Sequence, residues 1–146
     1  MLIIGRKDRA ELPLLGVANV PVKIDSGAYS CSIHCDYVQE ELINGKVVLC
    51  VVFFDKNSIK YSGDKLYFQT FKKKKVKSST GEEQERYFVQ LSIILFGKEY
   101  PTDFSLTKRN GLRNPILFGR KLINNNFLID TTKINLSFRA SKLSNK

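Results

Sequence analysis

The sequence predicts a single, mainly β domain of antiparallel strands, and two observations support this prediction. The chain has 146 residues, of which 42% are hydrophobic and 26% charged, a length and composition typical of one globular domain. Its apolar residues recur in short runs rich in β-branched and aromatic side chains, and seldom at the helical spacing of three and four. We therefore expect one domain over residues 1 to 138, followed by a basic tail at 139 to 146.

Seven runs of the sequence have the character of strands. The run at 85–96 alternates most clearly, with Val89 and Leu91 on one face and Gln90 on the other, which is typical of a half-buried antiparallel strand. In chain order the expected strands are 2–5, 20–24, 29–33, 47–55, 65–71, 85–96 and 99–107.

Two turns and two short helices complete the expected fold. Glycine-containing turns at 79–83 and 96–100 separate strand-like runs, so both are expected to be hairpins. Residues 36–44 are expected to form a helix that begins at Asp36 and ends at an Asn-Gly pair. A second helix is expected at 120–124.

Charge is the unusual feature of the composition. The 24 Lys and Arg residues outnumber 14 Asp and Glu, giving a net charge of +10, which favours nucleic acid, anionic lipid or an acidic peptide as a partner. Three cysteines form an odd set, which indicates reduced thiols. The N-terminus lacks the apolar centre of a signal peptide, and the longest apolar run, 47–54, is too short to cross a bilayer. We expect a cytoplasmic protein with no membrane partner.

The tripeptide Asp25-Ser26-Gly27 follows an expected strand and is the first candidate for chemistry. Serine can bond a turn backbone and glycine permits close backbone approach, so this geometry suits a carboxylate held in a crevice. The same three residue types are also the commonest in plain turns. A second apolar strand, at 114–119, ends in glycine and leads into the second expected helix.

Three short stretches carry a resemblance to a known family. They are Asp25 to Ala28 with Ser32 and His34, the turn Lys77-Ser78-Ser79-Thr80-Gly81 with Glu85-Arg86-Tyr87, and Pro115 leading to Leu117-Phe118-Gly119-Arg120. Together they resemble the small retropepsin-like proteins labelled ATP-dependent zinc proteases, whose relatives are associated with ATP-grasp ligases that add glutamate to protein tails. The resemblance implies a closed β-barrel of the acid-protease type, with a flap hairpin and one or two short helices.

The resemblance also implies an aspartic-type peptidase in which Asp25 is catalytic. Such enzymes need two carboxylates that share one proton, one to activate water and one to polarise the scissile carbonyl. The only other candidate by pattern, at 128–132, lacks the glycine. We therefore expect a homodimer in which each chain supplies one Asp25 and Ser26 bridges the loops across the two-fold axis.

The remaining site residues are assigned by the same resemblance. Support of the active loop is expected from Ser26, Gly27, Ala28, Leu117, Phe118 and Gly119. The flap is expected at Lys77, Ser78, Ser79, Thr80 and Gly81, although an ordinary surface hairpin fits the same residues. Substrate contacts are expected from Ser32, His34, Arg86 and Arg120.

The basic run Lys72 to Lys75 has three interpretations: a solvated strand end, a nucleic-acid patch, or a surface that guides substrate. Arginine binds carboxylates with two parallel hydrogen bonds, so Arg86 and Arg120 fit an acidic substrate. We expect an endopeptidase for acidic peptides, oligoglutamate among them. The alternative is a non-catalytic basic module for nucleic acid or acidic protein, which would bind in a salt-sensitive way and ignore Asp25→Asn.

Metal and cofactor sites are not expected. Cys31, His34 and Cys35 are all zinc-ligand types. On a strand, however, His34 would point away from the two cysteines, so the three could not converge. The chain also lacks a GxxxxGK[ST] phosphate loop, so no nucleotide is expected. A zinc hydrolase remains the alternative that metal analysis would decide.

Overall fold

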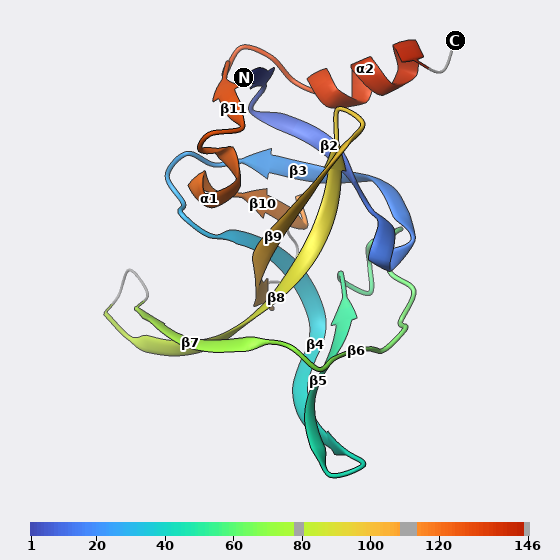
Figure 1. The fold of residues 1–146 in the computed structure, drawn as a ribbon, viewed down its shortest axis with the longest axis vertical. Helices are drawn as coiled ribbons and strands as arrows, with labels where there is room; N and C mark the ends of the chain where they lie inside the picture. Colours follow the sequence, from blue (N-terminus) through green and yellow to red (C-terminus); the bar gives the residue numbers. More distant parts are fainter. Residues whose placement is uncertain (78–80, 109–113, 145–146) are drawn as a thin grey trace.

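A computed structural model describes residues 1–77, 81–108 and 114–144 and shows a mainly β chain (Figure 1). Within these residues no helix is both long and apolar enough to cross a membrane. In chain order the elements are β1 (Leu2–Ile4), β2 (Lys7–Leu12), the 3-10 turn η1 (Pro13–Leu15), β3 (Val17–Ile24), β4 (Cys31–Ile43), β5 (Lys46–Phe53), β6 (Leu66–Phe68), β7 (Lys72–Lys77), β8 (Glu83–Leu95), β9 (Lys98–Thr107), β10 (Ile116–Phe118), α1 (Arg120–Ile123), β11 (Phe127–Ile129) and α2 (Leu136–Ser144).

Most strands belong to one sheet, in which the short strand β10 pairs with both β3 and β4. The order of pairing is β10-β3-β2-β8-β9-β4-β5-β6, with β7 paired to β8. Strand β10 runs parallel to β3 and antiparallel to β4, so it lies between them. It therefore joins the two strands that flank the Asp25 loop. The closed barrel expected from the sequence stays a prediction.

The strands around the Asp25 loop each bury one face. The residues between the buried ones, such as Lys23 on β3 and Ser32 on β4, point to the opposite face, because successive side chains of a strand alternate. This outward face of β3, β10 and β4 carries the pockets described below. The buried residues on the core face of these strands are Val20, Val22, Ile24, Cys31, Ile33, Cys35, Ile116 and Phe118.

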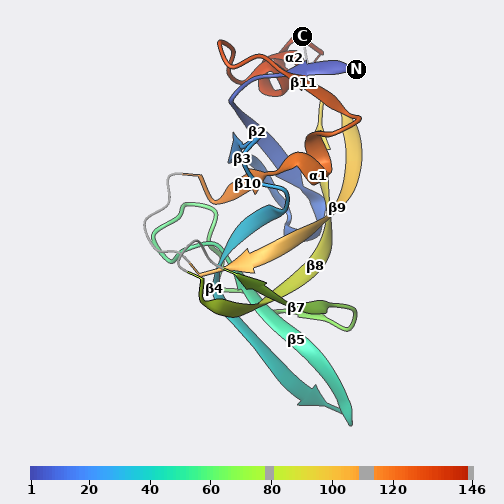
Figure 2. The same cartoon turned by 90° about the vertical axis from the view of Figure 1, so that its left-hand side faces the viewer.

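The helix expected at 36–44 is wrong, because these residues continue strand β4. They pair with β5 as far as Ile43 opposite Lys46, and the hairpin projects from the rest of the chain as an arm (Figures 1 and 2). Asn44 and Gly45 have φ values of 51° and 78°, the left-handed geometry of a two-residue hairpin turn. The Asn-Gly pair therefore closes a hairpin and does not stop a helix.

The basic tail expected at 139–146 is helical over residues 139–144, which belong to helix α2. The buried carboxylate of Asp8 accepts hydrogen bonds from the backbone N–H of Ser137 at 2.9 Å and of Phe138 at 3.2 Å. The Arg9 guanidinium lies 4.4 Å from the centre of the Phe138 ring. These contacts dock the first turn of α2 on strand β2. The short helix expected at 120–124 is confirmed as α1.

Candidate active site

The Asp25 loop joins β3 to β4 and is tied to β10 by its backbone. The N–H of Asp25 donates to the carbonyl oxygen of Phe118 at 2.9 Å, which extends the pairing of β3 with β10 by one residue. The carboxylate oxygen Oδ1 of Asp25 accepts from the N–H of Gly27 at 2.9 Å. The side chain is therefore oriented by its own loop, as a reacting carboxylate must be.

The first residues of α1 hold the loop from its other side. The N–H of Arg120 donates to the carbonyl oxygen of Ala28 at 2.8 Å, and that of Lys121 donates to Tyr29 at 2.9 Å. The Arg120 side chain, expected to contact substrate, donates from Nη1 to the carbonyl oxygen of Ser26 at 2.8 Å. In this structure Arg120 therefore supports the loop with both its backbone and its side chain.

Gly119 permits this close approach of α1 to the loop. A Cβ atom at this position would lie 2.5 Å from the carbonyl oxygens of Tyr29 and Ser30, well inside contact distance. Only glycine fits here without a backbone movement. The pairing of an Asp-Ser-Gly loop with a later strand that ends in glycine, expected from the resemblance, is thus present in the structure.

A pocket of about 590 Å³ opens beside the Asp25 loop. Of the four expected substrate contacts, Ser32 and Arg86 line it and His34 and Arg120 do not. Several lining residues were not foreseen, although Lys23 was detectable because it lies two residues before Asp25 on the same strand face. The lining residues are Lys23, Asp25, Ala28, Tyr29, Ser30, Ser32, Val76, Arg86, Ser105, Thr107, Asn114, Pro115 and Leu117.

The β7–β8 hairpin reaches this pocket with Val76 and Arg86. Of the expected flap residues, Ser78, Ser79 and Thr80 lie outside the described residues, whereas Gly81 has a positive φ of 84°. The hairpin is thus placed as a flap would be, next to Asp25.

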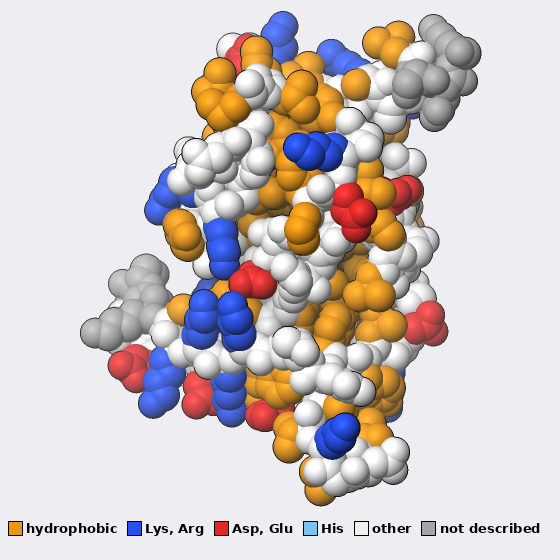
Figure 3. Space-filling view, in the orientation of Figure 1, with side chains coloured by type: hydrophobic (Ala, Val, Ile, Leu, Met, Phe, Trp, Pro, Cys, Tyr) orange, Lys and Arg blue, Asp and Glu red, His pale blue; other side chains and the backbone are white. Residues whose placement is uncertain are grey.

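The pocket-facing side of the hairpin is positively charged. Arg86 lies opposite Lys74 in the antiparallel register, so the two side chains share a face. The Lys74 ammonium lies 5.0 Å from the centre of the Phe88 ring. Lys and Arg side chains gather over this hairpin, with acidic side chains among them (Figure 3).

The other side of the hairpin balances its charge. Lys73 lies 3.3 Å from a carboxylate oxygen of Glu40 and 3.2 Å from one of Glu85. The Tyr87 hydroxyl donates to Glu40 at 2.6 Å, and hydrogen bonds from Tyr87 and Lys73 lower the pKa of the Glu40 carboxyl. Lys73 is therefore compensated by acids on this side of the hairpin, whereas Arg86, on the opposite side, lines the Asp25 pocket.

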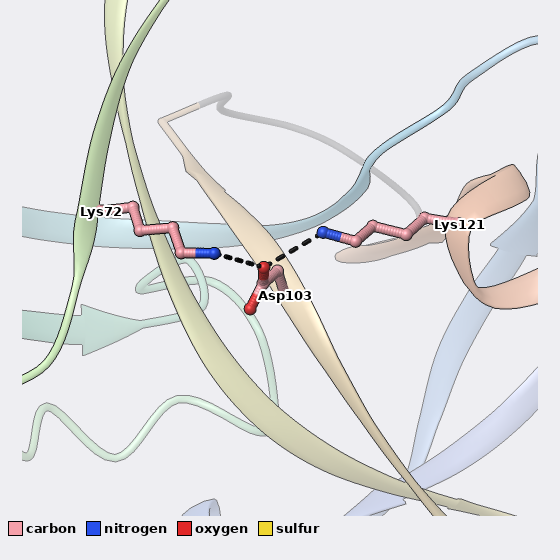
Figure 4. A network of polar contacts seen from close by, with 3 residues as sticks. All are labelled: Lys72, Asp103 and Lys121. Atoms are coloured by element: carbon pink, nitrogen blue, oxygen red, sulfur yellow. Dashed lines mark hydrogen bonds and ion pairs between the residues drawn. The ribbon is translucent and has the colours of Figure 1, made fainter.

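One carboxylate links the start of strand β7 to α1 (Figure 4). Oδ2 of Asp103 lies 3.3 Å from Nζ of Lys72, on β7, and 3.1 Å from Nζ of Lys121, on α1. Burial acts to raise the pKa of Asp103, but Lys121 and Lys72 outweigh it and lower that pKa. The side chains are partly exposed, so the energetic value of each contact is small. The two contacts nevertheless connect the first residue of β7 to α1, the helix that supports the Asp25 loop.

Ser105 has a buried hydroxyl that is unsatisfied by any residue the structure describes. It lines the Asp25 pocket and is 1% exposed. Ser137 is comparably buried, but its hydroxyl accepts from the N–H of Phe96 at 2.8 Å.

Ser105→Ala is expected to leave the free energy of unfolding unchanged or to raise it, because it removes a polar group without breaking a bond. The matched change Ser137→Ala leaves the Phe96 N–H without its acceptor and should cost about 1–3 kcal/mol. Urea unfolding of both variants measures the difference. Equal losses in both proteins would contradict the unsatisfied state of Ser105.

The three cysteines are free thiols and all are buried. Cys31 and Cys35 lie in the core, on the strand face opposite His34, as the strand geometry predicts. Burial raises the pKa of both thiols. Residues 1–77, 81–108 and 114–144 contain no group of three His, Cys, Asp or Glu side chains able to hold a metal. The absence of a functional metal stays a prediction.

His34 lines a separate pocket of about 600 Å³. Its side chain is 3% exposed. Burial lowers the pKa of His34, and the charges of Asp55 and Asp36 oppose that change only in part. Burial therefore favours the neutral form of the imidazole. Pro115 lines this pocket and the Asp25 pocket alike.

The geometry agrees with a comparison against known families. A family model described as the retropepsin-like aspartic endopeptidase RimB matches residues 3–139. The chain belongs to the RimB-like family. The resemblance that the sequence motifs predict is thereby confirmed. A crystal structure of Lpg0085, a Legionella pneumophila protein described as of unknown function, superposes on this RimB-like chain with a TM-score of 0.67, 24% identity and coverage of 93% of this chain and 98% of the other. That likeness shows the shared fold.

Curated relatives of this RimB-like chain are much longer proteins. A "Probable alpha-L-glutamate ligase" of Shewanella pealeana is 28% identical over 134 residues, which are 90% of this chain but 29% of the relative. A protein of the same name from Desulfotalea psychrophila is 23% identical over 128 residues, which are 88% of this chain and 28% of the relative. The chain thus spans less than a third of the curated relatives it matches.

Proposed function

We propose that this RimB-like chain is an aspartic endopeptidase that acts as a homodimer on acidic peptides. One observation carries the proposal: a single oriented carboxylate, Asp25, lines a pocket between a glycine-supported loop and the β7–β8 hairpin, whose Val76 and Arg86 line the same pocket. Among the described residues that line this pocket, Asp25 is the only acid.

The homodimer is proposed because each chain supplies only one carboxylate to the described lining of the pocket. Aspartic catalysis needs one ionised carboxylate to take a proton from water and one protonated carboxyl to polarise the peptide carbonyl. Two carboxylates placed side by side repel when both are ionised, so the pair retains one proton. In the proposed dimer the partner's Asp25 completes this pair, and Ser26 lies at the junction of the two loops.

The charge of the pocket supports an acidic substrate. Lys23 and Arg86 both line it and provide charge-assisted donors to a substrate carboxylate. The curated relatives named as glutamate ligases contain a region similar to this chain, which supports a peptide chain of glutamate as the substrate.

The proposal predicts that the native chain cuts a glutamate oligomer without added metal or nucleotide, and that its rate per chain rises with protein concentration. The rise is expected because the active pair exists only in the dimer. Mass spectrometry of the products, over a dilution series, measures both effects. A lysine oligomer of equal length is the control and should stay intact. A rate per chain that does not change with dilution would contradict the dimer, and intact glutamate oligomer at every concentration would contradict the peptidase.

A further inference from the structure

We propose that the His34 pocket is a second substrate compartment, in which a peptide bound over Asp25 continues along the same face of the sheet. The proposal rests on the proposed function and extends it to a binding site away from the reacting bond. The ligand class is an extended peptide with acidic side chains.

The strand register shows that the two pockets are neighbours on one face. Lys23, Leu117 and Ser32 lie side by side across β3, β10 and β4, and all line the Asp25 pocket. Pro21 lies two residues before Lys23 on β3, and His34 lies two residues after Ser32 on β4. Both line the His34 pocket. Because strand side chains alternate, a step of two residues stays on the same face. The two pockets are therefore neighbours along this face, and Pro115 lines both.

Pro115 marks the boundary between the compartments. It lines both pockets, and its carbonyl oxygen accepts a hydrogen bond from the N–H of His34 at 2.8 Å. Two residues of strand span about 6.7 Å. Same-side side chains of an extended peptide repeat at this distance as well, so one peptide can place alternate side chains in the two compartments.

The second compartment offers cations to a carboxylate side chain. Arg9 and Lys60 line it. The Arg9 guanidinium lies 4.4 Å from the centre of the Phe138 ring, which belongs to a neighbouring pocket that Arg9 also lines. Asp55 is the one acid among the described lining residues, and its Oδ1 accepts from the N–H of Asn57 at 3.2 Å. The described residues that line this compartment thus include two cations, one acid and the buried His34.

Length dependence of binding tests this inference. Glutamate oligomers of increasing length are titrated into the Asp25→Asn protein, in which binding is measured without cleavage. Affinity is expected to rise by on the order of tenfold once an oligomer is long enough to reach the second compartment, which is the effect of one additional charge-assisted contact. Lys60→Glu, placed in the same background, should abolish this rise for the long oligomers.

The control variant is Lys46→Glu, which makes the same charge change at an exposed residue where β5 begins, at the end of the arm. It should keep the length-dependent rise. A rise that persists in Lys60→Glu, or that is lost equally in both variants, overturns the second compartment. Cleavage of short oligomers by the native chain would still support the peptidase in that case. If no oligomer is bound or cut at any length, the proposed function and this inference fail together.

Discussion

An Asp25→Asn protein is expected to fold normally and to cut glutamate oligomers slower by a factor of about 10³ or more. Loss of a positioned general base costs roughly 10²–10⁴ in rate, and the proposed dimer also loses the protonated carboxyl that polarises the substrate carbonyl. Asparagine keeps a side-chain oxygen that can accept from the N–H of Gly27, so the loop retains its internal hydrogen bond. It cannot take a proton from water at neutral pH. Single-turnover cleavage and the urea unfolding midpoint, measured together, separate chemistry from folding.

Asp130→Asn is the matched control for this experiment. Asp130 begins the Asp-Thr-Thr stretch that lacks the glycine, and its Oδ1 accepts from the N–H of Thr132 at 2.9 Å and from its hydroxyl at 2.6 Å. It does not line the Asp25 pocket, so cleavage should continue. If Asp25→Asn cuts as fast as the native chain, Asp25 is not catalytic. Salt-sensitive binding of nucleic acid by both variants would then favour the basic binding module.

Gly119→Ala is expected to lower the free energy of unfolding by about 3 kcal/mol, at the upper end of the cost of overpacking, and to abolish cleavage. The new methyl group would lie 2.5 Å from the carbonyl oxygens of Tyr29 and Ser30, and these are backbone atoms that cannot rotate away. Relief requires the Asp25 loop to move away from α1. That movement breaks the bonds that Ala28 and Tyr29 accept from α1.

Gly45→Ala provides the contrast, because Gly45 has a φ of 78° and open space around its Cβ position. It should cost only about 1 kcal/mol, the penalty of an L-residue in the left-handed region, and leave cleavage unchanged at the far end of the arm. Urea unfolding and oligomer cleavage are measured on both variants. A Gly119→Ala protein that is as stable and as active as Gly45→Ala would show that the loop tolerates a separation from α1.

Much of the fold was predictable because the apolar pattern of single segments agrees with the strands that they form in the tertiary structure. The strand expected at 85–96 is present as β8, where alternating apolar residues face the core. The pairing of Asp25 with Phe118, and the approach of Gly119 to Tyr29 and Ser30, were predictable only through the resemblance. The register that joins β3 to β10 is a tertiary property that the periodicity of one strand does not contain.

Other elements were missed for identifiable physical reasons. The segment 36–44 has a polar, acidic composition that fits an exposed helix, but it forms the two-sided arm, where packing against β5 overrides local propensity. Strand β2, Lys7–Leu12, was not predicted from the sequence. Its exposed positions are charged, and only three of its residues are buried, so its apolar pattern is weak. Helix α2 depends on the carboxylate of Asp8, which is 129 residues away from Ser137 in the sequence. No local pattern predicts such a cap.

The hydrogen bonds that hold the Asp25 loop have a consequence for biosynthesis. Arg120 and Ser26, whose contact fixes the loop, are 94 residues apart in the sequence, and contacts of such separation form late because long loops are costly to close. A nascent chain that has not yet exposed β10 and α1 outside the ribosome has no partner for the Asp25 backbone. The ordered loop therefore arises only after β10 and α1 have been made, so the Asp25 carboxylate is not held in its folded orientation earlier in synthesis.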